Sequence, residues 1–380
     1  MMLLKLVHPE TCNQNCKTMK TSSKELITGR RNALKMIGLG TAGMLAGGFR
    51  DILAAEPEDS KPAPKETTVR GNSSVAFTTG TDRQEMIYKV IKPFEQEIKK
   101  GIRGKQLIIK VNMVTTNVAL CATHVDALKA LLEYMKPIYK GQIIVAESSS
   151  VVETSDGFKN YGYLDLQKNY NVKFVDLNTD QGSPFHILDS NLHLEEIPLA
   201  KTFLDPNNYI ITLSRLKTHN RVVMTAGLKN MVMGAPLVLS NDRTSGRHYK
   251  SKMHSGGERF LHYNMFLVGQ NVRPDFTIID GVEGMEGNGP SAGTPVDHRI
   301  ALAGEDVVAV DSMCSRLMGI PLDSVGYLNY LASAGIGNTD RSKIDIIGSE
   351  DPDKHIIKYK LHENIETQLK WKDPVVVTTI

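Results

Sequence analysis

Short apolar runs alternate with longer amphipathic stretches along most of the chain. The apolar runs are rich in Ile and Val and lie between polar or glycine-containing segments, which is typical of buried β-strands. One run contains Lys110, whose ammonium group needs a carboxylate partner or an anionic ligand unless it lies at a solvated edge. The pattern predicts strands at residues 73–78, 106–111, 142–146, 172–177, 209–213, 276–279 and 344–347.

The stretches between these runs carry apolar side chains spaced three and four residues apart, as amphipathic helices do. In the first stretch, Ile87, Val90 and Ile91 fall on one face. Thr123 is the expected N-cap of the second helix. The spacing predicts helices at 82–99, 123–139, 305–318 and 324–333. Together the elements predict an α/β fold, with a mostly parallel sheet covered by helices on both faces of a single large domain.

Residues 1–55 have the layout of an export signal. Arg30 and Arg31 precede an apolar stretch at 36–49, and small residues follow it. The paired arginines resemble the twin-arginine pattern, although Gly29 stands where that pattern has a small hydroxyl residue. We therefore expect export by the twin-arginine machinery to the periplasm or cell envelope, without a stable membrane span in the mature form. An ordinary secretory signal or an uncleaved anchor are the alternatives.

Composition divides the chain further. Residues 56–70 are polar and contain several prolines, which predicts a flexible linker. Residues 71–350 hold the predicted α/β domain, and 351–380 form a C-terminal extension. Met19 lies at a more usual distance from the paired arginines than Met1, so Met1 and Met19 are alternative starts.

The charge of the chain is concentrated at its front. The formal net charge is +3, but residues 1–55 hold eight Lys or Arg and three Asp or Glu. The remainder has 45 − 8 = 37 basic and 42 − 3 = 39 acidic residues, so it is nearly neutral. A near-neutral domain without a basic stripe argues against nucleic acid as a partner.

Four cysteines are present, and Cys12 and Cys16 precede the apolar part of the predicted signal. Cys121 and Cys314 remain in the mature chain, and two thiolates cannot hold a four-cysteine iron–sulfur cluster. No iron–sulfur cofactor is therefore expected. The two remaining cysteines form either one disulfide or two buried free thiols.

Four predicted strands end at polar or charged residues. Asn112 and Glu147 follow two of them, Asp280 follows a third, and the segment from Arg215 to His219 follows a fourth. Ligands of open α/β sheets bind beyond the carboxyl ends of the strands, so these residues are expected to share one site. Lys217 and His219 are two residues apart in an extended stretch, which predicts that both side chains point to the same side.

Three further segments supply candidate groups. Residues 225–230 resemble a helix start, where backbone N–H groups and Lys229 would favour an anion. Residues 280–290 are glycine-rich and contain acidic side chains suited to metal binding or to acid–base catalysis. Residues 241–257 form a polar, basic loop or lid that carries His254. Asp311, inside a predicted helix, is expected to be a buried polar partner.

These considerations give each candidate a role. The predicted catalytic residues are Lys217, His219 and Glu286. The predicted ligand-binding residues are Lys110, Asn112, Arg215, Lys229, Asn230 and His254. The predicted metal ligands are His124, Glu147 and Asp280, a donor set that suits a divalent transition metal. For several of them the alternative is a purely structural role or a solvated surface position.

Several of these segments together resemble the domain-of-unknown-function 362 (DUF362) family. They are 108–113, 124–127 (His-Val-Asp-Ala), 146–148, 216–219 (Leu-Lys-Thr-His), 227–234, 280–290 and 306–311. The resemblance covers nearly all of the predicted mature chain. Some relatives append a ferredoxin-like module with two four-cysteine clusters, and this chain lacks those cysteines. The family name itself implies no established biochemical role.

Three functional hypotheses follow. The first is a metal- or cofactor-dependent enzyme that acts on a small anionic substrate. The second is a non-catalytic envelope protein that binds a small anion or a metal. The third is a redox partner without an iron–sulfur cluster of its own.

Overall fold

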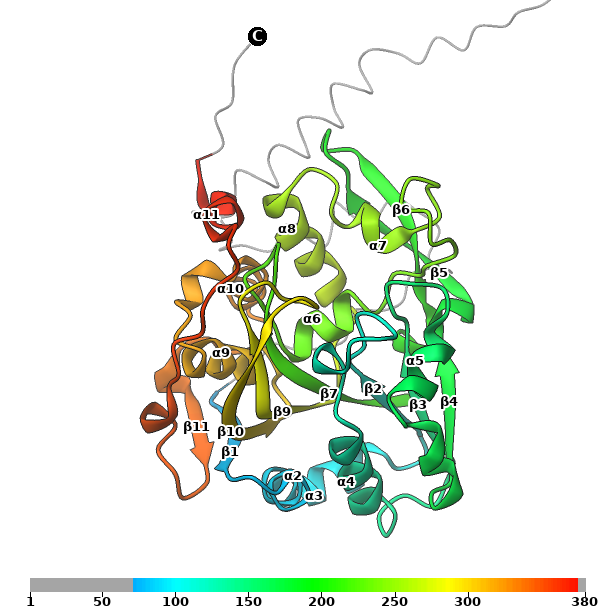
Figure 1. The fold of residues 1–380 in the computed structure, drawn as a ribbon, viewed down its shortest axis with the longest axis vertical. Helices are drawn as coiled ribbons and strands as arrows, with labels where there is room; N and C mark the ends of the chain where they lie inside the picture. Colours follow the sequence, from blue (N-terminus) through cyan, green and yellow to red (C-terminus); the bar gives the residue numbers. More distant parts are fainter. Residues whose placement is uncertain (1–70, 375–380) are drawn as a thin grey trace, which may run out of the picture.

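A nine-stranded mixed sheet forms the centre of the molecule (Figure 1), in a computed structural model that describes residues 71–374. Its main path has the order β11-β1-β10-β9-β7-β2-β3-β4, and β8 pairs with β7. The strands are β1 (Ser73–Thr79), β2 (Gln106–Val111), β3 (Ile143–Glu147), β4 (Val172–Asp176), β7 (Asn208–Thr218), β8 (Met224–Thr225), β9 (Phe276–Glu286), β10 (Thr294–Gly304) and β11 (Ile344–Ile347). The predicted signal segment and linker, with Cys12 and Cys16, lie outside the described residues, as does the end of the C-terminal extension.

Most neighbouring strands run parallel. Parallel pairs join β11 to β1 and connect β9, β7, β2, β3 and β4, whereas β10 is antiparallel to both β1 and β9. The predicted fold class is confirmed. The sequence pattern missed β10, because its first half is polar and exposed and only its second half reads as a buried run. A separate hairpin, β5 (Gly182–Leu188) with β6 (Leu194–Ala200), lies beyond the sheet.

Helices cover both faces of the sheet, as predicted (Figure 1). One face packs on α2 (Arg83–Ile91), α3 (Glu95–Gly101) and α4 (Val125–Met135). The other packs on α6 (Gly227–Val232), α8 (Glu258–Gly269), α9 (Val307–Leu317) and α10 (Gly326–Ser333). Each layer contributes apolar side chains to its own buried cluster. The shorter helices are α5 (Thr154–Asn160), α7 (Tyr249–Lys252) and α11 (Ile365–Leu369).

The first two predicted helices are shorter than their patterns suggested. Residues 92–94 form a 3₁₀ turn between α2 and α3, because Pro93 has no N–H to continue the α-helical bonding. The next helix begins one residue later than expected, with His124 and not Thr123 as its N-cap. The Thr123 hydroxyl is instead 2.8 Å from the Asn112 N–H and donates to the Leu213 carbonyl at 2.6 Å, so it ties α4 to the sheet.

Strands β7 and β9 extend well past their predicted ends. The glycine-rich segment after residue 279 lies beyond the predicted strand, but β9 continues to Glu286 because β10 pairs with it from Gly304 back to Thr294. That pairing joins residues distant from β9's own apolar run, so the local pattern did not reveal it. Cys121 and Cys314 are buried free thiols, which decides between the two alternatives for these residues.

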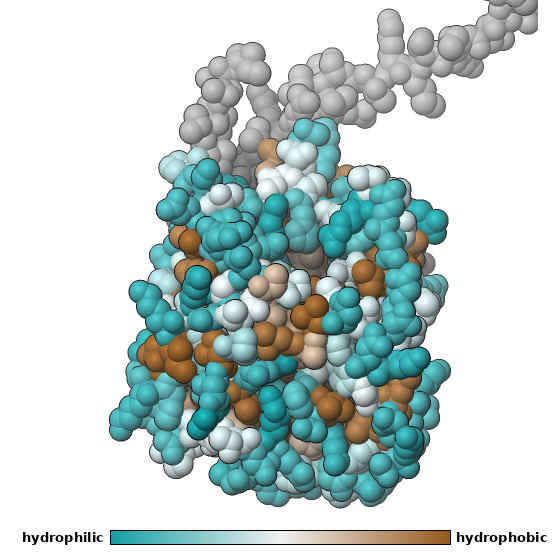
Figure 2. Space-filling view, viewed as in Figure 1, coloured by the Kyte–Doolittle hydropathy of each residue, from teal (hydrophilic) through white to brown (hydrophobic). Residues whose placement is uncertain are grey.

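The last described residues pack on the domain. Tyr359 is buried with its hydroxyl 2.9 Å from His298 Nδ1, and the side chain of Gln368 is fully buried. Among residues 71–374, no helix is both long and apolar enough to cross a bilayer. The face in Figure 2 is largely hydrophilic, with apolar residues in small groups.

Candidate functional site

A cavity of about 480 Å³ lies at the carboxyl ends of β2, β3 and β7, on the side of the sheet that α6 covers. We call it the basic pocket. Among the residues that line it are Lys110, Asn112, Glu147, Ser148, His219, Arg221, Thr225, Lys229, Asn230, Arg243, His248, Lys250 and His254. Seven of the twelve predicted site residues are in this list, among them the strand-end residues Asn112, Glu147 and His219.

The floor of the pocket is a buried ion pair. Lys110 and Glu147 are each 1% exposed, and the lysine Nζ lies 2.6 Å from Glu147 Oε1. Nζ also donates to the Val111 carbonyl at 2.8 Å and to Asn230 Oδ1 at 3.0 Å. The partner carboxylate that the sequence required for Lys110 is therefore Glu147. With three acceptors in reach, this ammonium group is structurally satisfied.

The residues around this pair complete the floor. Asn230 lies on α6 and donates to the Thr212 hydroxyl at 2.9 Å, while Asn112 donates to Asn230 at 3.0 Å. Glu147 Oε1 also accepts the Ser148 N–H at 2.7 Å. Asn112 Oδ1 and Glu147 Oε2 remain buried without a hydrogen-bond partner. Unpaired buried acceptors are costly, so the floor is polar beyond what packing requires.

Helix α6 does not present its N-terminus to a ligand, contrary to the prediction. The first N–H groups, of Gly227 and Leu228, donate to the carboxylate of Asp311 at 2.8 and 2.9 Å. Asp311 lies on α9 and is fully buried, so it is the structural partner that the sequence suggested. The helix start is thereby neutralised from within the fold.

Lys229 is the group in the pocket that most needs a ligand. Its side chain is 8% exposed, and it makes no hydrogen bond or ion pair with the described residues. Burial, together with the positive charges of Lys217 and Lys250, lowers the pKa of Lys229 to about 7. A buried ammonium without a carboxylate partner is unfavourable, and an anion in the pocket would relieve it.

His219 follows the end of β7 in a tight turn. Its N–H donates to the Val223 carbonyl at 2.9 Å, and Val223 has a left-handed φ of 68°, which is unusual for a β-branched residue. Gln368 holds the turn from the C-terminal segment, accepting the Val223 N–H at 2.7 Å and donating to the His219 carbonyl at 2.9 Å. The histidine is thus fixed by a residue about 150 positions away in the chain.

The basic loop at 241–257 closes one side of the pocket. Its short helix α7 starts at His248, whose ring accepts the Ser251 N–H at 3.2 Å. Lys250 is buried and donates to the Ser148 carbonyl and, at 2.9 Å, to the Ser148 hydroxyl. Burial lowers the pKa of Lys250 to about 7, although Glu147 acts in the opposite direction. The sequence pointed to this loop but identified only His254 in it.

The lining of the pocket carries a strong excess of positive charge. Lys110, Arg221, Lys229, Arg243 and Lys250 face a single acid, Glu147. Because Glu147 is already paired with Lys110, the remaining cations have no carboxylate of the pocket lining to balance them. Low-dielectric walls strengthen this positive potential, which favours an anionic ligand.

The other five predicted residues do not line the basic pocket. Arg215 points to the face covered by α2 and α4, because alternate residues of β7 face opposite sides. Asp280 pairs with Arg83 of α2 at 3.0 Å, and His124 caps α4. Lys217 donates to the Cys121 carbonyl at 2.6 Å and is not among the residues that line the pocket.

Glu286 also has a structural contact, because its Oε2 accepts the Lys360 N–H at 2.8 Å. The predicted metal set is not brought together: Glu147 lies in the basic pocket and is paired with Lys110, whereas Asp280 and His124 do not line that pocket, and Asp280 is paired with Arg83. Within residues 71–374, no three His, Cys, Asp or Glu side chains form a group that could hold a metal ion.

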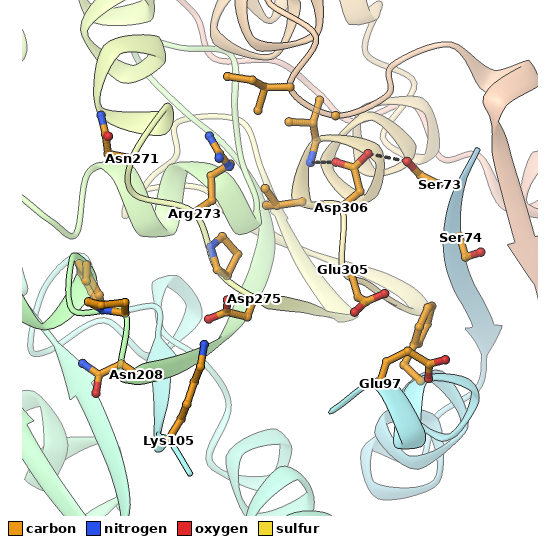
Figure 3. A pocket seen from close by; sticks show the side chains of 18 of the residues that line it. Ser73, Ser74, Glu97, Lys105, Asn208, Asn271, Arg273, Asp275, Glu305 and Asp306 are labelled. Carbon is orange, nitrogen blue, oxygen red and sulfur yellow. Dashed lines mark hydrogen bonds between the residues drawn. The ribbon is translucent and has the colours of Figure 1, made fainter. Parts of the chain in front are cut away.

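A second, larger cavity lies at the opposite edge of the sheet, where β1, β7 and β9 begin (Figure 3). We call it the amino-edge cavity; its volume is about 1110 Å³. Its lining includes five acids, Glu97, Asp205, Asp275, Glu305 and Asp306, and two bases, Lys105 and Arg273. Asp306 caps α9 and accepts the Ser73 hydroxyl at 2.6 Å, so its carboxylate is used by the fold.

Comparison with known proteins identifies the family of this chain but does not assign it an activity. The chain is 24% identical over 220 residues to a thylakoid-associated protein of Synechocystis sp., covering 57% of this chain and 63% of that protein. It also resembles the lactate racemase apoprotein from Thermoanaerobacterium thermosaccharolyticum, with a TM-score of 0.40 and 12% identity over 67% of this chain and 58% of that one. A Thermotoga maritima structure gives a TM-score of 0.37 and 10% identity, over 57% and 55% of the two chains.

A family model also matches more than half of the chain. Residues 107–316 match the model described as domain of unknown function (DUF362). The matched range runs from β2 to α9 and contains most of the residues that line the basic pocket. The chain therefore belongs to the DUF362 family.

Proposed function

We propose that the basic pocket binds a small organic anion and that Lys229 is the main contact for its negative charge. The observation that carries this proposal is the Lys229 ammonium group, which is 8% exposed and lacks a carboxylate partner. A fold gains nothing from burying such a charge, whereas a binding site gains an electrostatic contact that water does not screen.

The other lysines of the pocket do not have this character. Lys110 has Glu147, and Lys250 donates twice to Ser148, so both stabilise the walls. The contrast matters because three buried lysines around one cavity could all be structural. Lys229 alone among these three lacks a partner within the described residues, so it is available to a ligand.

Binding should raise the pKa of Lys229, because a negative charge beside the ammonium group favours its protonated form. The free group has a pKa of about 7. The site therefore binds anions best below pH 7, and affinity falls as the pH rises above that value and Lys229 loses its proton. We expect each of the first units above pH 7 to weaken binding by up to about tenfold.

The test is calorimetric titration of the protein with small carboxylates and inorganic phosphate at pH 6 and pH 9. A change of Lys229 to Met should weaken binding at pH 6 by about tenfold or more, since a charge-assisted contact contributes on the order of 1.5–3 kcal/mol. Lys105→Met, in the amino-edge cavity, is the matched control and should bind like the wild type. Equal anion binding by wild type and Lys229→Met would refute the proposal.

We further propose export through the twin-arginine pathway, on the strength of Arg30 and Arg31 before the apolar stretch. Replacing both arginines by lysine should keep the charge but retain a fused reporter in the cytoplasm. Unchanged export of that variant would contradict the twin-arginine route.

A further inference from the structure

Two histidines of the basic pocket have their ring protons fixed by the backbone. His219 Nδ1 accepts the Arg221 N–H at 3.0 Å, so its remaining proton lies on Nε2. His254 Nδ1 lies 2.7 Å from the Lys250 carbonyl oxygen and must donate to it, so its Nε2 carries a lone pair. The pocket thus holds one imidazole donor and one imidazole acceptor.

Neither Nε2 atom is used by the described part of the fold. Within the described residues both rings form their hydrogen bonds at Nδ1. His248, which lines the same pocket, differs because its Nε2 lies 3.1 Å from the Ser150 carbonyl and its Nδ1 accepts from Ser251. Two of the three lining histidines therefore keep a free Nε2, and His248 is structural.

Both rings are neutral at physiological pH. Burial, reinforced by the charge of Lys229, holds the pKa of His219 well below its ordinary value. Burial also lowers the pKa of His254 to about 4, and Lys229 contributes in the same direction. A neutral donor and a neutral acceptor beside an ammonium group form the arrangement needed to bind a carboxylate and move a proton next to it.

Building on the proposed function, we propose that this site enolises a small 2-oxo carboxylate. Lys229 holds the carboxylate, the Nε2–H of His219 donates to the carbonyl oxygen, and Nε2 of His254 is the general base. Each contact matches one protein group to one group of the substrate. The ammonium group binds the carboxylate, the imidazole N–H donates to the carbonyl oxygen, and the imidazole lone pair accepts the proton of the acidic C–H.

The step balances without any further reactant. His254 Nε2 takes a proton from the carbon next to the carbonyl and becomes an imidazolium. The electron pair of that C–H bond forms the carbon–carbon double bond, and the carbonyl π pair moves to the oxygen. That oxygen is stabilised by the His219 Nε2–H, since a neutral imidazole can act as the electrophile for a developing enolate. Return of a proton from the imidazolium to carbon completes the cycle.

Substrate binding should also strengthen the base. Because the ammonium of Lys229 contributes to the low pKa of His254, a carboxylate beside Lys229 offsets that contribution. The pKa of His254 then moves back toward its ordinary value, where it removes protons more effectively. At saturating substrate the rate should therefore rise with pH as bound His254 deprotonates. The ratio kcat/KM should fall above about pH 7, where Lys229 of the free protein loses its charge.

Proton exchange tests this without knowledge of the product. The full chain is incubated in D₂O with pyruvate or 2-oxobutyrate, and loss of the C3 proton signal is followed by NMR against a protein-free sample. We expect exchange well above background. Replacing His254 by Gln should slow it by about 100-fold or more, and His219→Phe should slow it comparably. His186→Gln, on the exposed hairpin β5–β6, is the control and should match the wild type.

Each of the other possible results would overturn either the enolisation proposal or the proposed function. Lys229-dependent binding of 2-oxo acids without exchange, or exchange that persists in His254→Gln, would overturn the enolisation proposal. Binding of phosphate but of no 2-oxo acid would overturn it while leaving the proposed anion site intact. Failure to bind any anion would instead refute the proposed function. Borohydride trapping that adds substrate mass to Lys229 would replace the histidine mechanism by an imine. Melting curves confirm that each variant is folded, and His254→Asn serves if His254→Gln is not.

Discussion

The two cavities at opposite edges of the sheet differ in size, in charge and in how far the fold uses their polar groups. The amino-edge cavity is the larger, about 1110 Å³ against about 480 Å³, and its lining is acidic. Asp306 in its lining accepts four hydrogen bonds, from Ser73, Val308, Ala309 and Asn338. Figure 3 shows the one from Ser73. The basic pocket instead keeps Lys229 without a partner. A buried charge without a partner, more than the volume of the cavity, therefore identifies the candidate site.

The difference has a topological cause. Asp306 serves as the N-cap of a helix that begins at the amino edge, where its negative charge is stabilised by the first turn. At the carboxyl edge, strands β2, β3 and β7 end beside one another and deliver residues from distant parts of the chain. Asp306 at the first edge is held by hydrogen bonds of the fold, whereas Lys229 at the second edge has no partner within the described residues.

The largest expected effect concerns the floor of the basic pocket. Lys110→Met should destabilise the protein by about 3–5 kcal/mol, because it leaves the buried Glu147 carboxylate without its partner. Urea denaturation measures this loss. The exposed pair Arg316–Asp353 is the matched control, and Arg316→Met should cost less than about 1 kcal/mol. Similar losses of stability in Lys110→Met and Arg316→Met would show that the buried pair contributes no more to stability than the exposed one.

The next effect has the opposite sign. Lys229→Met should stabilise the ligand-free protein by on the order of 2 kcal/mol at pH 6, because it removes a buried unpaired charge. The folded pKa of Lys229, about 7, lies below its unfolded value, so the wild type recovers this stability as the pH rises from 7 toward 10. Thermal unfolding at pH 6 and pH 9 should show a gain that shrinks with pH. A loss of stability at pH 6 would mean that Lys229 has a structural partner.

At the amino-edge cavity, Asp306→Ala should cost about 1–2 kcal/mol, since it removes the N-cap of α9 and the acceptor of the Ser73 hydroxyl. Chemical denaturation gives the loss, and calorimetry at pH 6 should give wild-type anion affinity. Weakened anion binding in this variant would contradict the separation of the two cavities.

The smallest effect is expected from Lys105→Met, which removes a cation from the amino-edge cavity. The melting temperature should change little, and the stabilisation of the protein by added anions should equal that of the wild type. If added anions no longer stabilised Lys105→Met, the anion site would lie in the amino-edge cavity and not in the basic pocket.

Much of the fold could be predicted from local pattern. The apolar runs that became β1, β2, β3, β4, β7, β9 and β11 were each recognised, because a buried strand needs a short continuous apolar segment. Strand β10 and the second half of β9 were not, because they stabilise each other across the sheet and carry polar residues. The helix boundaries differ from the predicted ones at Pro93, which interrupts the first helix, and at His124, which caps the next. Apolar periodicity alone does not include these local effects.

The candidate site was predicted in part for the same reason. Lys110, Asn112 and Glu147 follow directly from where their strands end. Arg215 and Lys217 were misplaced because a strand's alternation, and a register shift between these two residues, sends them away from the pocket. Lys250 was missed because it lies in a polar loop without a strand to place it, and its contact with Ser148 spans about 100 positions.

The amino-acid pattern was enough to predict the α/β class, the parallel core strands and the edge at which polar groups gather, because these depend on apolar periodicity and on strand direction. The tertiary structure decided which charges find partners. Glu147 neutralises Lys110, Asp311 occupies the start of α6, and Lys229 is left facing the cavity. Whether a charge is paired depends on the distance between segments that are far apart in the sequence. No local pattern could therefore distinguish Lys110, which has a structural partner, from Lys229, which has none within the described residues.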